Sequence, residues 1–275
     1  MLILLILNAN RLQGKDGTQI PFLVSVCSSG DHICNGVLIH ESWVLTAAHC
    51  LVLEGELPSI RDRNSLKRTR LVVSVRTPDE DVKRLSQQVF IHRQFKSESR
   101  LNDVAMIHTD EPFQLNNGVE IIQIENETVN LHEHELETMS WGGNRSHIFP
   151  CMEGNLELLR LPMVEHKLCV ELYNKSVYEE YLQPDRVICV GNFGDSFCNG
   201  HTGGPIVFEG KLVALVIING GCKQMLPSVN ILVKPYIGWI KSTMISMQHA
   251  NSLWPSFSSA RVVVICSLLT INCIK

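Results

Sequence analysis

Short apolar stretches, each broken after a few residues by Gly, Asn, Asp or Pro, dominate the chain between Pro21 and Trp239. The stretches that stand out are Phe22–Val26, Gly36–Ile39, Leu71–Val75, Val104–Ile107, Pro205–Val207 and Leu212–Ile218. Short strands with such frequent breaks are typical of β-sandwiches and β-barrels. The pattern therefore predicts an all-β fold.

One segment near the end departs from this pattern. Tyr236–Gln248 contains no proline, and its apolar residues Ile237, Ile240, Met244 and Met247 recur at helical spacing. We expect a terminal helix there. The length of 275 residues suits either one large all-β unit or two small domains, and length alone leaves both open.

The charge balance does not favour a polyanionic partner. Charged residues make up 19% of the chain and the formal net charge is -4, which gives no general reason to expect binding to nucleic acid or to an anionic membrane. The segment Arg61–Arg70 is a local exception, with five basic residues and one acidic residue. Two interpretations of it stand: a solvated loop, or a positive patch that docks an acidic partner.

Cysteine usage indicates an oxidising compartment. The ten cysteines are spread along the chain and are not gathered into Cys-x-x-Cys pairs, which favours disulfides over zinc. Glycosylation sequons occur at Asn126, Asn144 and Asn174. Together these features predict a secreted or extracellular glycoprotein.

Both ends carry apolar segments. Residues 1–14 begin with an apolar run that is short for a signal core and has no basic residue before it, so we expect a weak or truncated signal or pro segment. Val262–Ile274 is too short to span a bilayer comfortably as a helix. Residues 249–275 match the layout of a glycolipid-anchor signal, which would attach the protein to the cell surface. The alternative is a tail without any membrane role.

Three motifs follow one another along the chain. Ser42–Cys50 is SWVLTAAHC, Asn102–Ile107 is NDVAMI, and Cys198–Pro205 is CNGHTGGP. In order, approximate spacing and apolar flanks they resemble the segments of trypsin/chymotrypsin-like serine proteases that carry the catalytic histidine, aspartate and serine. The resemblance covers about residues 20–247.

This resemblance implies two six-stranded antiparallel β-barrels, a C-terminal helix and an active cleft between the barrels. The halves would meet near residues 125 to 135. The implied divisions are a trypsin-like domain at 15–247, with barrel 1 at about 20–128, barrel 2 at about 129–235 and the terminal helix at 236–248, followed by the tail at 249–275.

The resemblance also implies disulfides. The family's cystine pairs fall on Cys34–Cys50, Cys169–Cys189 and Cys198–Cys222. A fourth family bridge would need cysteines where this chain has Leu136 and Phe208, as expected for a bridge replaced by apolar packing. We hypothesise an extra bridge between Cys27 and Cys151, which fall in loops that are neighbours in the family. The pairing of Cys266 and Cys273 in the tail stays open.

Carried over residue by residue, the family mechanism assigns roles to this chain. His49 would be the general base, Asp103 the carboxylate that orients it, and the N–H groups of Gly200 and Thr202 the oxyanion hole. Thr202 replaces the nucleophilic serine, and its methyl group restricts χ1 in a tight turn. We therefore expect most catalytic activity to be lost.

The activation switch of the family is altered as well. His201 stands where active relatives have an aspartate that pairs with a new amino terminus and shapes the oxyanion hole. Residues 10–15 hold at most a degraded and shortened activation site. A buried carboxylate without its ammonium partner is costly, so the joint loss of both is physically coherent.

Substrate-binding positions have changed too. Ile217, Ile218 and Asn219 replace the Ser-Trp-Gly of the strand that pairs with substrate. Asn219 and Ser228 replace glycines of the primary specificity pocket, which should narrow it. Ser196, at the expected base of the pocket, is uncharged and would not select Lys or Arg; a register error of one would put Asp195 there instead.

These departures lead to three hypotheses. The first is a catalytically inactive homologue that acts by binding a protein or peptide, through the old cleft rim or the basic segment Arg61–Arg70. The second is a weak or specialised endopeptidase that uses Thr202 with His49 and Asp103. The third is a purely structural or surface-anchored protein. We expect no cofactor, metal ion or nucleic acid in any of them.

Overall fold

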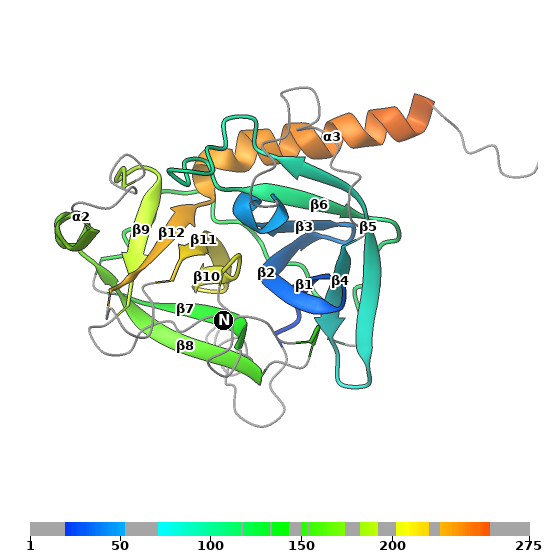
Figure 1. The fold of residues 1–275 in the computed structure, drawn as a ribbon, viewed down its shortest axis with the longest axis horizontal. Coiled ribbons are helices and arrows are strands. Elements are labelled where there is room, and N and C mark those ends of the chain that lie inside the picture. The colour runs from blue at the N-terminus through cyan, green and yellow to red at the C-terminus, as the bar shows by residue number, and fades with distance from the viewer. Residues whose placement is uncertain are drawn as a thin grey trace, which may run out of the picture.

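The computed structural model describes residues 20–52, 71–116, 118–132, 134–142, 150–152, 155–173, 182–191, 202–219 and 226–253. Within them the chain forms two closed β-barrels that lie side by side, the first built from the N-terminal half and the second from the C-terminal half (Figure 1). The expected fold class, two six-stranded antiparallel barrels with a C-terminal helix, is confirmed.

The first barrel closes in the strand order β1-β2-β3-β6-β5-β4. Alternate residues of its strands, such as Val24, Val26 and Val73, are fully buried in one apolar cluster that fills the barrel. This alternation follows from the two-residue period of a strand. The strands are β1 (Leu23–Ser28), β2 (Asp31–His40), β3 (Trp43–Thr46), β4 (Val72–Arg76), β5 (Asp81–Ile91) and β6 (Ala105–Thr109).

The second barrel closes in the order β10-β11-β12-β9-β8-β7. Leu136 on β7 is fully buried in its core, and Phe208 on β10 packs against the same cluster, so apolar packing occupies the positions of the missing family bridge. The strands are β7 (Glu135–Gly142), β8 (Asn155–Val164), β9 (Val187–Val190), β10 (Pro205–Phe208), β11 (Lys211–Ile218) and β12 (Ser228–Leu232).

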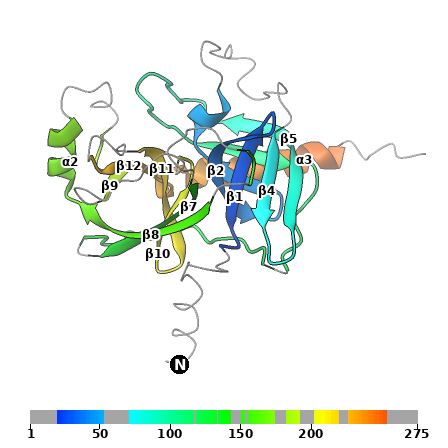
Figure 2. The same cartoon turned by 60° about the horizontal axis from the view of Figure 1, so that its bottom comes forward.

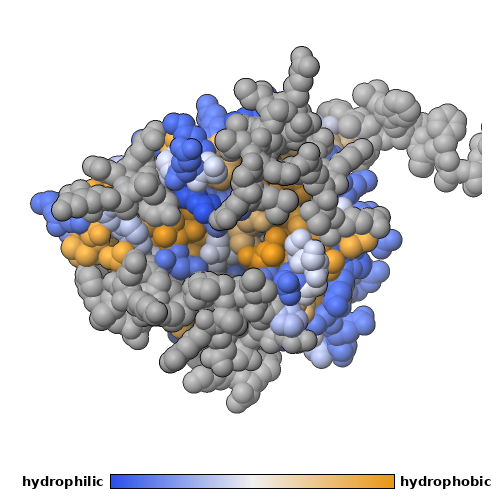
Figure 3. Space-filling model, viewed as in Figure 1, coloured by the Kyte–Doolittle hydropathy of each residue, from blue (hydrophilic) through white to orange (hydrophobic). Residues whose placement is uncertain are grey.

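A third apolar cluster joins the barrels. It combines Leu45 and Met106 of the first barrel with Met139, Leu215 and Val229 of the second, all completely buried. On the face shown in Figure 3, hydrophobic residues lie on both sides of the line where the barrels meet.

Within the described residues, two helices and short 3-10 turns accompany the barrels. Helix α3 (Ile237–Leu253) follows the 3-10 turn Lys234–Tyr236 and continues five residues beyond the expected end at Gln248. It runs along the first barrel, whereas α2 (His166–Tyr173) lies at the far end of the second (Figures 1 and 2). Helix α2 was not expected from the sequence. Among the described helices, none is long and apolar enough to cross a membrane.

Three disulfides lie within the described residues: Cys34–Cys50, Cys169–Cys189 and Cys27–Cys151. The first two are pairs implied by the family resemblance, and the third is the hypothesised extra bridge. Several expectations concern residues outside the described part of the chain: the pair Cys198–Cys222, the tail cysteines Cys266 and Cys273, the sequons at Asn144 and Asn174, the segment Arg61–Arg70, and both termini. Asn126 is exposed.

Candidate functional site

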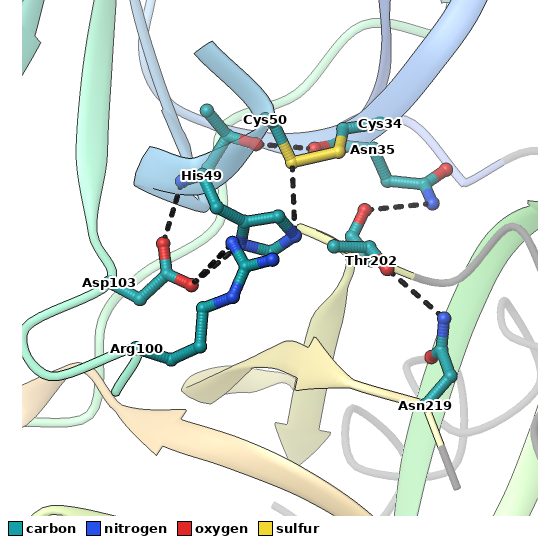
Figure 4. Close-up of a disulfide and its surroundings, with 9 residues drawn as sticks. Cys34, Asn35, His49, Cys50, Arg100, Asp103, Thr202 and Asn219 are labelled. Atoms are coloured by element: carbon teal, nitrogen blue, oxygen red, sulfur yellow. Dashed lines mark hydrogen bonds and ion pairs between the residues drawn. A yellow bond between two sulfur atoms is a disulfide. The ribbon is translucent and has the colours of Figure 1, made fainter. Parts of the chain in front are cut away.

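His49 and Asp103 meet at the junction of the barrels. His49 lies on the 3-10 turn η2 (Ala48–Leu51), which directly follows β3, and the buried Ala47 and Ala48 fix the start of this turn. The Asp103 carboxylate is completely buried and accepts two hydrogen bonds from His49 (Figure 4). The backbone N–H donates to Oδ1 at 2.8 Å, and the ring Nδ1–H donates to Oδ2 at 2.6 Å.

This pair has the geometry that the sequence motifs imply. A carboxylate bonded to Nδ1–H fixes the tautomer that leaves Nε2 available as a base. The side chain of His49 is 17% exposed, so solvent or a ligand can reach the ring. The pair could accept a proton from a hydroxyl brought to Nε2.

The loop before β6 adds a residue that the sequence analysis did not single out. Arg100 lies beside the pair, with Nη1 3.9 Å from Asp103 Oδ2 (Figure 4). Ile217, at the position where the family resemblance implies a serine that supports this aspartate, is buried in the cluster between the barrels. The guanidinium of Arg100 therefore lies next to Asp103, whereas the side chain of Ile217 offers no hydroxyl.

Thr202 lies on a turn held against both barrels. Its carbonyl accepts hydrogen bonds from the backbone N–H of Asn35 at 2.8 Å and from the Asn35 side chain at 3.4 Å. The amide of Gly203 donates to Val216 at 2.7 Å. Asn35 Oδ1 accepts from the backbone of Trp141, so one buried side chain links the nucleophile turn to β7.

The hydroxyl of Thr202 is hydrogen-bonded to Asn219, a position that the sequence analysis assigned to the specificity pocket. Asn219 Nδ2 donates to Thr202 Oγ1 at 3.0 Å, and the hydroxyl is directed toward Asn219 (Figure 4). Among the hydrogen bonds of the described residues, none joins Thr202 to His49. The His49 Nε2 atom instead lies 4.0 Å from Cys50 Sγ.

The sequence analysis placed Asn219 at this pocket but did not foresee its bond to Thr202. Only the fold brings the two side chains together, because they lie 17 positions apart, Thr202 on the turn before β10 and Asn219 directly after β11. The one available signal was the replacement of a glycine by a residue with an amide side chain at the mouth of the pocket.

The remaining pocket positions are only partly described. The Ser228 hydroxyl is buried and donates to Val190 O at 2.9 Å, and the Asn230 amide donates to Ser228 Oγ at 3.0 Å. Polar side chains therefore fill the interior near β12. Ser196, Gly200 and His201 lie outside the described residues.

Among the described residues, one group of potential metal ligands occurs, and it includes His49. Ligand atoms of Cys34, His49 and Cys50 lie within 4.8 Å of one another. Because the two cysteines form a disulfide, they have no thiolate to offer, and a metal is held by thiolate rather than by a disulfide.

Comparisons with known proteins agree with the motifs. The family model "Trypsin" matches residues 11–240. Pig trypsin is 28% identical over 237 residues, covering 82% of this chain and 91% of the relative. Chicken trypsin I-P1 is 28% identical and rat submandibular glandular kallikrein-9 is 27% identical, each with 82% of this chain and 85% of the relative covered.

Among solved structures, neuropsin, a serine protease expressed in the limbic system of mouse brain, has the same fold. The TM-score is 0.65 at 22% sequence identity, with 82% of this chain and 94% of that chain covered. The family model matches most of the chain, and the structure has two barrels with the His49–Asp103 pair between them. This chain therefore belongs to the trypsin family.

Proposed function

We propose that this chain is a trypsin-family homologue without peptidase activity, which works outside the cell by binding a protein or peptide. The observation that carries the proposal is the hydrogen bond from Asn219 to Thr202. In the family mechanism the nucleophile's hydroxyl gives its proton to the histidine Nε2. Here the hydroxyl oxygen points toward an amide donor instead.

The rate consequences of this arrangement are large. A misplacement of about 1 Å in a reacting group costs roughly a hundredfold in rate, and loss of a triad nucleophile costs on the order of a millionfold. The Thr202 hydroxyl is hydrogen-bonded to Asn219 and not to His49, and the residue itself is a threonine where the family has a serine. The sequence adds His201 and the degraded activation segment, which both weaken the oxyanion hole.

The binding role is supported by what the chain retains. The fold, the three described disulfides and the hydrogen-bonded pair of His49 and Asp103 are all intact. A buried carboxylate left without its partners is costly, so the pair has a structural reason to persist without catalysis. Disulfides fit a protein of the secretory pathway, and the exposed sequon at Asn126 is compatible with glycosylation there.

Covalent labelling tests this proposal. A fluorophosphonate probe reacts with activated hydroxyls, so we expect no adduct on Thr202 in the folded protein. We expect Thr202→Ser to remain unable to hydrolyse a peptide ester efficiently, because the oxyanion hole still lacks support. Thr202→Ala is the matched control, and equal melting temperatures of the three proteins would establish that each is folded.

The role of Asn219 is tested in the same assay. Removing its amide in the double variant Thr202→Ser/Asn219→Gly frees the serine hydroxyl to turn toward His49. We expect roughly tenfold faster labelling than with Thr202→Ser alone, the effect of about one hydrogen bond. A Thr202 adduct in the unmodified protein, or ester turnover abolished by Thr202→Ala, would instead establish the endopeptidase alternative.

A further inference from the structure

Among the described disulfides, only Cys27–Cys151 joins the two barrels. Cys27 lies on β1 of the first barrel, and Cys151 lies between β7 and β8 of the second. The other two described disulfides each lie within one barrel and its attached helix or turn. Opening Cys27–Cys151 would therefore remove a covalent link between the barrels without breaking either barrel.

The two sulfurs of this disulfide differ in their access to solvent. Cys27 is only 1% exposed, whereas Cys151 is half-buried. Thiol–disulfide exchange begins when a thiolate attacks one sulfur of the disulfide, and its rate depends on which sulfur the thiolate can reach. Attack from solvent therefore falls on Cys151, which makes Cys27 the leaving group.

The sulfur of Cys27 lies beside a buried hydroxyl. Ser25 Oγ is 3.2 Å from Cys27 Sγ and 2.8 Å from His32 Nδ1. Ser25 and Cys27 lie two positions apart on β1, on the face opposite to Val24 and Val26 of the barrel core. His32 pairs with Cys27 across β1 and β2. All three polar side chains are buried, so the hydroxyl is fixed between the sulfur and the imidazole.

This hydroxyl can stabilise negative charge on the leaving sulfur. A buried charge without a hydrogen-bond donor is costly, and hydrogen bonds to a charged acceptor are about twice as strong as those between neutral groups. A thiolate at Cys27 would be the strongest acceptor next to Ser25, so the hydroxyl hydrogen would point to it. A leaving thiolate that is stabilised in this way departs faster.

The sulfur of Cys151 has a more distant hydroxyl. Ser74, which pairs with Ser25 across β1 and β4, places its Oγ 3.9 Å from Cys151 Sγ. The corresponding distance from Ser25 Oγ to Cys27 Sγ is 3.2 Å. The hydroxyls and the exposure thus favour the same direction of cleavage, with attack on Cys151 and departure of Cys27.

Backbone contacts hold Cys151 beside the first barrel independently of the bond between the sulfurs. Cys151 N donates to Gly30 O at 2.8 Å, and Asp31 and Pro150 form a β-bridge. These contacts involve no sulfur atom. They would keep the two cysteines near each other after the disulfide opens, so that it can form again.

We propose that Cys27–Cys151 is a reversible thiol-exchange switch between the barrels, which a small thiol opens at Cys151. In the first step the thiolate of the small thiol bonds to Cys151 Sγ. The bond between the two cysteine sulfurs breaks, and its electron pair stays on Cys27 Sγ, which then takes from solvent the proton that the small thiol lost.

A second molecule of the small thiol completes the reduction. It attacks the mixed disulfide, releases Cys151 as a thiol, and leaves joined to the first molecule by a disulfide bond. Two small thiols are thus oxidised to one disulfide while one cystine is reduced to two cysteines. This chemistry is separate from the binding role proposed above, because it involves neither Thr202 nor a protein partner.

Reduced glutathione is the probe that tests this proposal on the full, folded chain. Samples are quenched with acid at intervals, free thiols are alkylated, and each cysteine is assigned by peptide mapping with mass spectrometry. The expected first product carries glutathione on Cys151 and a free thiol on Cys27. It should form before Cys169–Cys189 opens, because both of those sulfurs are buried.

The bridge Cys34–Cys50 is the closer comparison. Cys50 is half-buried, as Cys151 is, so a thiolate can approach both bridges. Within the described residues, however, no hydroxyl lies in hydrogen-bond contact with Cys34 Sγ, the sulfur that would have to leave. We therefore expect glutathione to open Cys34–Cys50 more slowly than Cys27–Cys151.

Serine variants separate the two ends of the disulfide. Ser25→Ala removes the donor to the leaving sulfur and should slow the opening of Cys27–Cys151 roughly tenfold, the effect of about one hydrogen bond. Ser25→Thr keeps a hydroxyl and should restore most of the rate. Ser74→Ala is the matched control, because it removes a buried hydroxyl next to the sulfur that is attacked, and it should leave the rate unchanged.

Four outcomes would overturn the proposal. They are glutathione appearing first on Cys27, another described bridge opening before Cys27–Cys151, equal rates for Ser25→Ala and Ser74→Ala, and failure of the opened pair to form again in oxidised glutathione. If Ser25→Ala does not fold, the position of the first adduct in the unmodified protein still decides the direction of cleavage.

Discussion

Single substitutions in this chain act together with their neighbours. We expect the threonine at the nucleophile position to lower reactivity by its shape, and its hydroxyl also accepts a hydrogen bond from the amide of Asn219. Likewise, Ile217 lies where the family resemblance implies a serine near Asp103, and Arg100 lies 3.9 Å from the same carboxylate. The catalytic consequence of each change therefore depends on the other residues at the site.

His32 is a residue whose protonation state is tied to folding. It is 4% exposed, and burial lowers its pKa to about 4. Its Nδ1 atom lies 2.8 Å from the buried Ser25 hydroxyl. With a pKa this far below the ordinary value near 6.5, the folded protein holds this imidazole neutral at pH 7.

We predict that His32 makes the protein less stable in acid. As pH falls below about 6.5, the unfolded chain binds a proton at this histidine while the folded chain does not until pH about 4. Stability is therefore lost between these values, by up to about 3 kcal/mol, and not further below them. Urea unfolding at pH 7, 5.5 and 4 measures the loss.

The matched variants for this test are His32→Gln and, as a control at an exposed histidine, His132→Gln. His32→Gln should remove most of this loss of stability. The half-buried His92 and His108, whose pKa values are also lowered by partial burial, leave some dependence on pH in every variant. Equal slopes for both variants would contradict the role of His32.

At the scale of elements, the sequence predicted strands whose residues are mostly buried. The apolar stretches at 22–26, 71–75 and 212–218 correspond to β1, β4 and β11. By contrast β5 (Asp81–Ile91) consists mainly of half-exposed and polar residues, and only pairing with β4 and β6 defines it as a strand. Such a strand depends on its partners rather than on a local apolar signal.

At the candidate site, too, the sequence motifs assigned some residues, whereas other contacts became known only from the fold. Motifs with fixed spacing assigned His49 and Asp103, which the structure brings into hydrogen-bond contact. The bond between Asn219 and Thr202 and the position of Arg100 depend on side-chain directions at the junction of two barrels. Local sequence patterns carry no information about such directions.

The turn between Thr202 and β10 leads to a prediction about glycine. Gly203 has a φ of 77°, and a Cβ there would lie 2.3 Å from Asn35 O and 2.6 Å from Thr46 Oγ1. We expect Gly203→Ala to destabilise the protein by about 3 kcal/mol through backbone strain and overpacking. Gly210→Ala is the control, because its φ of 76° is similar but nothing lies within 4 Å.

Denaturant unfolding of both glycine variants separates the two effects. Gly210→Ala should cost only about 1 kcal/mol, the penalty for a left-handed backbone. If Gly203→Ala were no worse than Gly210→Ala, the turn would not be packed against Asn35 as tightly as described, and the restraint on Thr202 would have to come from elsewhere.

At the scale of the whole molecule, a disulfide, hydrogen bonds and a cation–π contact hold the two barrels together. The Cys27–Cys151 disulfide ties β1 to the segment 150–152, and Cys151 N donates to Gly30 O at 2.8 Å. Arg76 donates to Met152 O and stacks on Trp141, 4.6 Å from its ring centroid. With the shared apolar cluster, these contacts make the two barrels one structural unit.

We predict that Cys27–Cys151 stabilises the protein more than the other described bridges do. It spans 124 positions, against 20 for Cys169–Cys189, and the loss of chain entropy on closing a loop grows with its length. The chain-entropy model gives about 5 kcal/mol for the longer loop and about 3 kcal/mol for the shorter one.

The pair Cys27→Ala/Cys151→Ala should therefore lower the free energy of unfolding by about 1–2 kcal/mol more than Cys169→Ala/Cys189→Ala. Urea unfolding measures both, and an equal or smaller loss for the first pair would mean that the apolar cluster alone holds the barrels together.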